Sequence, residues 1–332
     1  MKSYIKGMGT YVPDRIVTND DLAKRFDTSD EWIRQRTGIE ERRYAEEGIG
    51  TSDLAKEAAV RAAADAGIEI EQIDFIILGT LSPDHHFPGT ACYLQPKLEL
   101  AGVPCLDIRQ QCTGWVYGMT LADSLIKTGP YQNILLVGSE VHSHALHFDD
   151  AGRDVTVIFG DGAGAAIVSP APEGSERGVL AHALHADGRH ADRLCYRLFD
   201  ISRIPLADAE YLESVENAWP YMEGRHVFKE AVVRMPEVVR EVLASTGHTI
   251  DDIDLLVPHQ ANLRINEYVV SSLGIAPEKV INNIQRFGNT TAASIPIALD
   301  EARRNGQVSQ GDLVCLVAFG AGFTWGAVTL RL

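Results

Sequence analysis

The sequence is short of positive charge and has no long apolar run. Its 332 residues contain 30 Lys and Arg against 46 Asp and Glu, which gives a formal net charge of −16. Nucleic acids and anionic membrane surfaces bind basic faces, so this balance argues against both as main partners. No apolar run reaches the roughly 20 residues that a transmembrane helix needs. We therefore expect no nucleic-acid or membrane partner, and an acidic protein partner would require a local basic patch.

Cysteine is scarce and shows no pairing pattern. None of the five cysteines forms a C-x-x-C pair, and their number is odd. Free thiols are typical of a reducing compartment. Residues 1–6 lack a charged head followed by an apolar core, so no signal peptide is expected. The predicted location is cytoplasmic.

Short apolar runs alternate with amphipathic stretches along the chain. The strand-like runs lie at residues 73–79, 133–138, 155–159, 253–258 and 312–319. Helical spacing of apolar residues is found over 51–66 and 115–126. This alternation predicts a layered α/β fold.

The two halves of the chain repeat the same order of elements. In the first half, a short strand at 104–108 leads to a turn, a helix and the strand at 133. The counterpart is a strand at 279–284, followed by a turn, a helix and the strand at 312. The repeat predicts two similar halves, 1–171 and 172–332, and aligns Cys112 with Asn289. Sites can form at the seam of such halves.

Segment 187–221 does not fit the repeat. It is rich in Arg, Asp and aromatic residues and has no clean period. We interpret it as a long excursion or lid.

Three residues at the ends of predicted elements are candidates for chemistry. Cys112 precedes the helix at 115–126, where free N–H groups and the helix dipole would lower the thiol pKa and favour a thiolate. His259 follows the strand at 253–258, and Asn289 follows Gly288 at the start of a helix. Taken singly, each residue has a simpler interpretation: a buried structural cysteine, a surface histidine and a helix N-cap.

Eight segments, spread nearly end to end, carry a family resemblance. The sequence resembles β-ketoacyl-[acyl carrier protein] synthase III, a family of condensing enzymes within the thiolase superfamily. The segments are GTYVPDRIVTNDDL (9–22), TSDEWIRQRTGIEER (28–42), FPGTAC (87–92), IFGDGAGAA (158–166), HADG (185–188), PHQANLRI (258–265), GNTTAASIP (288–296) and AFGAGFTWG (318–326). The resemblance implies a homodimer with the thiolase fold, in which two similar α/β halves form five αβαβα layers.

The resemblance also implies a reaction. Cys112 would take an acyl group from acyl-CoA, and His259 and Asn289 would stabilise the enolate formed when a malonyl-[acyl carrier protein] loses carbon dioxide. The backbone N–H groups of Cys112 and Ala321 would form the oxyanion hole. The result is a decarboxylative Claisen condensation in fatty acid or related specialised biosynthesis, with no cofactor beyond the two substrates.

Binding residues are implied in the same way. For CoA they are Thr28, Trp32, Arg36 and Arg153, since an indole stacks on a purine and guanidinium groups pair with phosphates. For the acyl chain they are Trp115 and Phe87, the latter supplied by the partner subunit. The basic patch for acyl carrier protein would consist of Arg225, Lys229 and Arg264. Gln110 and Gln111, where small residues are usual, suggest an unusual primer.

Other activities on the same fold stay open. One is acyl transfer to an alcohol or amine, or head-to-head condensation of two acyl-CoA molecules. Another is a non-condensing subunit that only binds acyl groups, which the presence of all three candidate residues disfavours.

A histidine cluster and a glycine-rich run are not assigned to the site. His142, His144 and His147 match no standard metal spacing, and we expect no metal. Gly160, Gly162 and Gly164 are interpreted as a tight turn into a packed strand rather than a phosphate loop.

Overall fold

The computed structural model describes residues 2–198, 200–214 and 218–332. A first sheet is built from the N-terminal half in the order β1-β7-β6-β4-β5. β6 pairs parallel to β4 and antiparallel to β7. Every residue of β6 is buried, including Ser139 and Glu140 at its end, and its first four residues are apolar. The strands are β1 (Ser3–Tyr11), β4 (Phe75–Gly79), β5 (Cys105–Ile108), β6 (Ile134–Glu140) and β7 (Gly162–Pro170).

A second sheet comes from the C-terminal half in the order β11-β12-β13-β8. β12 pairs parallel to β11 and antiparallel to β13, and it is buried throughout. The strands are β8 (Gly178–Ala186), β11 (Leu255–Pro258), β12 (Leu313–Gly320) and β13 (Thr324–Arg331). Two small ribbons pair β2 (Ile16–Thr18) with β3 (Glu41–Arg43) and β9 (Leu194–Cys195) with β10 (Tyr221–Met222).

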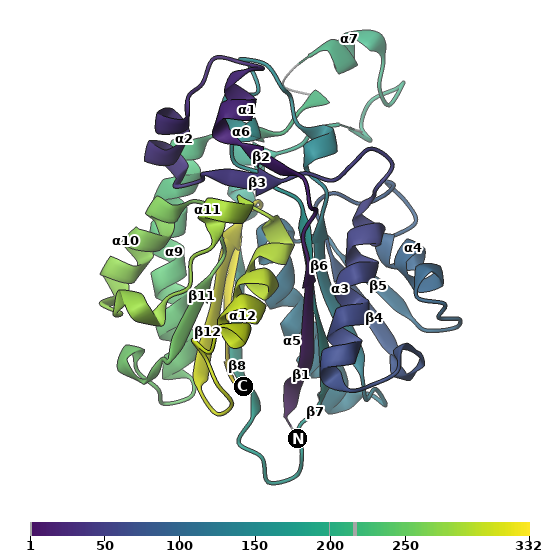
Figure 1. The fold of residues 1–332 in the computed structure, drawn as a ribbon, viewed down its shortest axis with the longest axis vertical. Helices are drawn as coiled ribbons and strands as arrows, with labels where there is room; N and C mark the ends of the chain where they lie inside the picture. Colours follow the sequence, from purple (N-terminus) through teal and green to yellow (C-terminus); the bar gives the residue numbers. More distant parts are fainter. Residues whose placement is uncertain (1, 199, 215–217) are drawn as a thin grey trace.

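Helices separate and cover the two sheets (Figure 1). α3 (Thr51–Ala66) packs on the outer side of the first sheet, and α9 (Gly224–Ala244) packs on the outer side of the second. α5 (Gly114–Thr128) and α12 (Ser294–Arg304) lie between the sheets. The predicted five-layer αβαβα thiolase fold is confirmed.

The remaining helices are short or peripheral. None of the described helices combines the length and apolarity that crossing a bilayer demands. The remaining helices with described bounds are α1 (Asn19–Ala23), α2 (Asp30–Thr37), α4 (Thr90–Lys97), α6 (Arg153–Thr156), α7 (Ala209–Glu213), α10 (Leu263–Leu273) and α11 (Ile284–Phe287).

The excursion at 187–221 folds back on α9. It begins with the 3-10 helix Gly188–Arg193, continues through β9 and α7, and returns through β10. Residues 199 and 215–217 of the excursion lie outside the described residues.

Two predicted strands are wrong. Residues 155–159 form the end of α6 and one isolated bridge, between Phe159 and Asn289, and the strand begins only at Gly162. A run of five residues, four of them apolar, has no period that distinguishes a strand from a packed turn. Residues 279–284 make a single bridge at Val280, because the Asn283 and Ile284 N–H groups donate to the side chain of Gln260 instead of to a strand.

The predicted register of the repeat is also wrong, by three residues. Two 3-10 turns, Gln111–Thr113 and Thr291–Ala293, have the same backbone, with φ values of 45° at Gln111 and 46° at Thr291. Each runs directly into an interlayer helix, α5 or α12. Cys112 therefore corresponds to Ala292, and Asn289 lies three residues before Ala292 in the sequence.

Two glycines of β1 allow α3 to lie directly on the sheet. A Cβ atom on Gly9 would come within 2.3 Å of the Ala62 backbone nitrogen, and one on Gly7 within 2.2 Å of that of Ala66. These distances are far below van der Waals contact, so a side chain would push the helix off the strand.

We expect Gly9→Ala to lower the free energy of unfolding by about 1–3 kcal/mol, the usual cost of overpacking a core. The matched control is Gly188→Ala, because a Cβ there meets no atom within 4 Å. Urea unfolding of both variants measures the difference. Equal midpoints would show that α3 does not rest on this glycine.

Candidate active site

A cavity of about 770 Å³ joins the two halves of the molecule. Cys112, His259 and Asn289 are buried and lie in its wall together. The cavity also has exposed lining residues, Arg36 and Arg225 among them. It therefore runs from a cationic mouth to a buried end that holds a thiol, an imidazole and an amide.

Cys112 lies on the 3-10 turn that joins β5 to α5, against the loop between β12 and β13. A Cβ on Gly320 would come within 2.7 Å of the Cys112 Cβ, so only glycine allows this approach. The backbone N–H groups of Cys112 and Ala321 both act on the thiol and favour its anion. The two N–H groups of the predicted oxyanion hole therefore both lie beside the thiol sulfur.

Burial nevertheless raises the pKa of the Cys112 thiol to about 12, and the buried Glu140 carboxylate adds to the rise. The prediction that a helix start would lower this pKa is therefore wrong. The cost of removing a charge from water outweighs the two backbone donors. Cys112 is a neutral thiol in the free protein.

His259 follows β11 and is held on two sides. Its backbone N–H donates to the Val317 carbonyl at 2.8 Å, and its Nδ1 lies 2.7 Å from Ser294 Oγ. Ser294 Oγ also accepts the Gln260 N–H at 3.3 Å, so its own hydrogen is available to Nδ1. We assign the Ser294 hydroxyl as donor to Nδ1 and the imidazole hydrogen to Nε2, which is buried and has no partner among the described residues.

Burial lowers the pKa of His259 to about 3. The ring is therefore neutral at physiological pH and offers one N–H to a ligand.

Asn289 lies between α11 and the 3-10 turn Thr291–Ala293. Its backbone N–H donates to the Ile158 carbonyl at 2.9 Å, and its carbonyl accepts the Gly160 N–H at 3.1 Å. Its side-chain oxygen accepts the Thr291 N–H at 2.8 Å. The amide NH₂ is thus the end of Asn289 left for a ligand.

Trp32 lies at the cavity with two of the predicted CoA residues. The Arg36 and Arg153 guanidinium carbons lie 4.2 Å and 4.9 Å from its ring centroids, and all three residues line the cavity. Thr28 is not part of the lining.

The two predicted acyl-pocket residues do not line the cavity of this chain. Trp115 is 1% exposed and packs in the core between the sheets. Phe87 is 81% exposed. Sequence reasoning missed the apolar side chains that do line the cavity, including Met222 from β10 and Phe228 and Met235 from α9. The helical spacing of Phe228 and Met235 places them on one apolar face. Nothing in the sequence shows whether such a face lines a cavity or packs in a core.

The predicted carrier-protein patch lies at and beside the mouth. Arg225 and Arg264 line the main cavity, and Arg225 and Lys229 line a shallow hollow next to it. All three side chains are exposed.

The three histidines of the HSHALH segment do not converge. His142 Nε2 lies 2.7 Å from Thr291 Oγ1, His144 contacts the Ala45 carbonyl, and His147 pairs with Asp149. Within the described ranges, the one group of potential metal ligands whose atoms lie within 4.8 Å of each other is His190, His226 and Glu230. Its two imidazoles hydrogen-bond to each other at 3.0 Å.

Fold and site together define a condensing enzyme of the thiolase superfamily. Residues 106–188 match the family model of 3-oxoacyl-[acyl-carrier-protein (ACP)] synthase III, and residues 243–332 match the model of its C-terminal part. The chain belongs to the β-ketoacyl-[acyl carrier protein] synthase III family, and the resemblance noted from the motifs is confirmed.

Individual relatives match along the whole chain. The β-ketoacyl-[acyl-carrier-protein] synthase III of Rhodospirillum rubrum is 46% identical over 100% of this chain and 99% of its own. That of Geobacillus kaustophilus is also 46% identical, with the same coverage. The crystal structure of the Aquifex aeolicus 3-oxoacyl-[acyl-carrier-protein] synthase III, 43% identical, superposes with a TM-score of 0.90 over 99% of this chain and 100% of its own.

We expect alkylation of Cys112 by iodoacetamide to accelerate about tenfold per pH unit between about pH 6 and pH 9. The thiolate fraction rises by that factor throughout the range below the thiol pKa of about 12. Peptide mass spectrometry follows Cys112 separately from the exposed Cys92. A plateau near neutral pH would mean that the helix start, not burial, controls this thiol.

Proposed function

We propose that the enzyme loads an acyl group from acyl-CoA onto Cys112 and condenses it with malonyl-[acyl carrier protein], in fatty acid or related specialised biosynthesis. One observation carries this proposal: a thiol, an unpartnered imidazole N–H and a free amide NH₂ share the buried end of a cavity that has a cationic mouth. The names of the relatives agree with it.

The loading step exchanges one thioester for another. The Cys112 sulfur attacks the acyl carbonyl, the bond to the CoA sulfur breaks, and the thiol proton ends on CoA. No net charge is created, so a neutral thiol in a buried site suits this exchange. The N–H groups of Cys112 and Ala321 supply the donors for the oxyanion formed on the way.

The condensation step needs neutral donors at a second carbonyl. When the malonyl carboxylate leaves as carbon dioxide, its bonding electrons form an enolate, whose oxygen accepts from His259 Nε2 and the Asn289 NH₂. The enolate carbon then attacks the acyl carbonyl on Cys112, and the freed thiolate takes up a proton. Burial at the inner end of the cavity strengthens these hydrogen bonds.

The mouth supplies the binding groups. Trp32 offers a ring for adenine, Arg36 and Arg153 offer charges for phosphates, and Thr28 is proposed as a further contact. Acyl carrier protein would dock on Arg225, Lys229 and Arg264. On a chain of net charge −16, such a local basic patch steers an acidic partner to one place.

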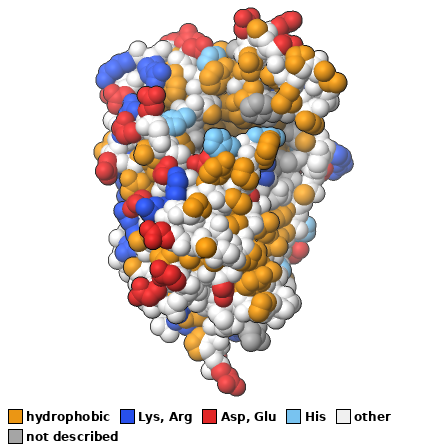
Figure 2. Space-filling model, turned by 90° about the vertical axis from the view of Figure 1, so that its right-hand side faces the viewer, with side chains coloured by type: hydrophobic (Ala, Val, Ile, Leu, Met, Phe, Trp, Pro, Cys, Tyr) orange, Lys and Arg blue, Asp and Glu red, His pale blue; other side chains and the backbone are white. Residues whose placement is uncertain are grey.

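We place the homodimer interface on the face that carries α4 and β5. β5 is the edge strand of the first sheet, so its outer edge is open to a second chain. Figure 2 shows hydrophobic side chains in a band down this face. Leu106 on β5 is 38% exposed, and the exposed Phe87 is then available to a partner's acyl pocket, beside Trp115. The dimer is proposed to work in the cytoplasm with acyl-CoA and carrier protein as its partners, without metal or cofactor.

Intact-mass analysis after incubation with a panel of acyl-CoA molecules tests the loading step. We expect one acyl adduct on the wild type and none on Cys112→Ser. The matched control Cys92→Ser should keep the adduct, because this thiol lies outside the cavity. If no acyl-CoA modifies Cys112, loading is not the function of this thiol.

Substitution of Trp32 tests the CoA site. Loss of base stacking costs about 1–3 kcal/mol, so Trp32→Ala should raise KM for acyl-CoA roughly tenfold or more and leave kcat nearly unchanged. Trp219→Ala is the control, since Trp219 stacks on His147 outside the cavity lining. Steady-state loading kinetics give both constants. An unchanged KM in Trp32→Ala would remove the ring from the CoA site.

A further inference from the structure

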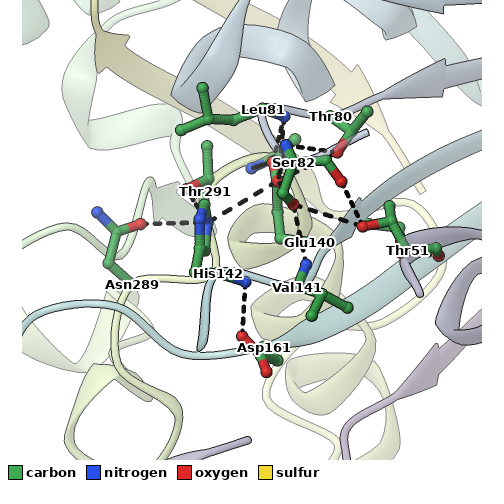
Figure 3. Close-up of polar contacts among 12 residues, drawn as sticks. Thr51, Thr80, Leu81, Ser82, Glu140, Val141, His142, Asp161, Asn289 and Thr291 are labelled. Atoms are coloured by element: carbon green, nitrogen blue, oxygen red, sulfur yellow. Dashed lines mark hydrogen bonds and ion pairs between the residues drawn. The ribbon is translucent and has the colours of Figure 1, made fainter. Parts of the chain in front are cut away.

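Asn289 is the end of a chain of buried polar contacts that leads away from the cavity (Figure 3). The Thr291 N–H donates to Asn289 Oδ1 at 2.8 Å, and Thr291 Oγ1 lies 2.7 Å from His142 Nε2. The next residue along the turn, Ala292, directs its N–H to Glu140 Oε1 at 3.4 Å. His142 and Glu140 belong to the first half of the chain, and neither lines the cavity.

Thr291 adopts a backbone conformation that needs support from outside. Its φ of 46° lies in the left-handed region, which a β-branched residue rarely occupies and which costs about 1–3 kcal/mol. The His142 ring holds its side chain, and Glu140 holds the following N–H. Gly138 lets this turn touch β6, because a Cβ there would come within 2.3 Å of the Ala292 carbonyl oxygen.

His142 is a fixed partner for Thr291. Its backbone N–H donates to Asp161 Oδ1 at 2.7 Å, and its ring packs on Phe159 at 4.6 Å between centroids. Burial lowers the pKa of His142 to about 3, so the ring stays neutral. Glu140 is anchored in turn by the N–H groups of Leu81 and Ser82.

The contact between Thr291 and Asn289 decides which end of the amide meets a substrate. The oxygen and NH₂ ends of an asparagine side chain have nearly the same shape, and rotation by 180° exchanges them. A backbone N–H can only donate, so it selects the oxygen and turns the NH₂ away from itself. A flipped amide would present lone pairs to an enolate oxygen and repel it.

We propose that His142 and Thr291 are positioning residues that lock the Asn289 amide with its NH₂ toward the substrate, with Glu140 as the anchor of the turn. This inference rests on the proposed function, because the Asn289 NH₂ acts as a hydrogen-bond donor only in the decarboxylation and condensation steps. Loading of Cys112 uses different donors, the N–H groups of Cys112 and Ala321. Comparing the rates of the two half-reactions therefore distinguishes a positioning role from a general loss of stability.

Two variants break the chain from opposite ends. Thr291→Val keeps the branched shape and removes Oγ1, and His142→Phe keeps a ring against Phe159 and removes Nε2. We expect the rate of malonyl decarboxylation to fall about 10- to 100-fold in each, up to the loss seen when an oxyanion donor is deleted. Acyl loading, followed by intact mass, should stay within about twofold of the wild type, a difference of under half a kcal/mol.

Two further variants complete the comparison. Thr291→Ser keeps the hydroxyl and should keep decarboxylation near the wild-type rate. Thr120→Val is the matched control, because it deletes a buried threonine hydroxyl that bonds only to the Val116 carbonyl in α5. It should alter neither half-reaction.

The ratio of decarboxylation to loading is the deciding quantity, since partial unfolding lowers both rates in proportion. An unchanged ratio in Thr291→Val and His142→Phe overturns the positioning role, whatever their melting temperatures. A wild-type enzyme that is acylated but releases no carbon dioxide from malonyl thioesters overturns the proposed function, and the inference falls with it.

Discussion

The close approach of two backbone turns at the seam of the molecule is the constraint on which the site depends. The turn that carries Cys112 and the turn that carries Thr291 lie against each other between the sheets. The contact has no room for a side chain at Gly114, where a Cβ would meet the Ala292 Cβ at 3.2 Å, and the second turn also packs on β6 at Gly138, where a Cβ would overlap the Ala292 carbonyl. This backbone packing brings a thiol from one half and an amide from the other to the same buried cavity.

Burial then sets the charge of the two titratable groups at the inner end of that cavity, the Cys112 thiol and the His259 imidazole. The pKa of the thiol rises and that of the His259 imidazole falls, for the same reason: a charged form loses its hydration. The site is therefore a set of neutral hydrogen-bond donors. Charge is confined to the mouth, where Arg36, Arg153 and Arg225 face solvent and meet polyanionic substrates at low desolvation cost.

Sequence patterns predicted the parts of the fold that follow from burial alone. β4, β12 and the first half of β6 are apolar runs that are almost entirely buried, and the helical period of α3 was readable in full. The run at 155–159 failed because its first four N–H groups donate to carbonyls three or four residues earlier, as in a helix. The run at 279–284 failed because a side chain takes two of its N–H groups. Gln260 takes the N–H groups that a strand at 279–284 would have used.

For the candidate site, the sequence indicated which residues to consider but not their protonation or their partners. Family motifs identified Cys112, His259 and Asn289, but the thiol pKa depends on enclosure, which no local motif encodes. In the sequence His142 stood out only as one of three closely spaced histidines that match no metal signature, and its partner Thr291 lies 149 positions away. The same left-handed turn occurs twice in the fold, and only the first copy carries a sulfur, with Ala292 at the matching place in the second. The symmetry of the scaffold is thus kept while its chemistry is divided: one turn presents a nucleophile, and the other, held by His142 and Glu140 of the opposing half, contacts the Asn289 amide of its own half.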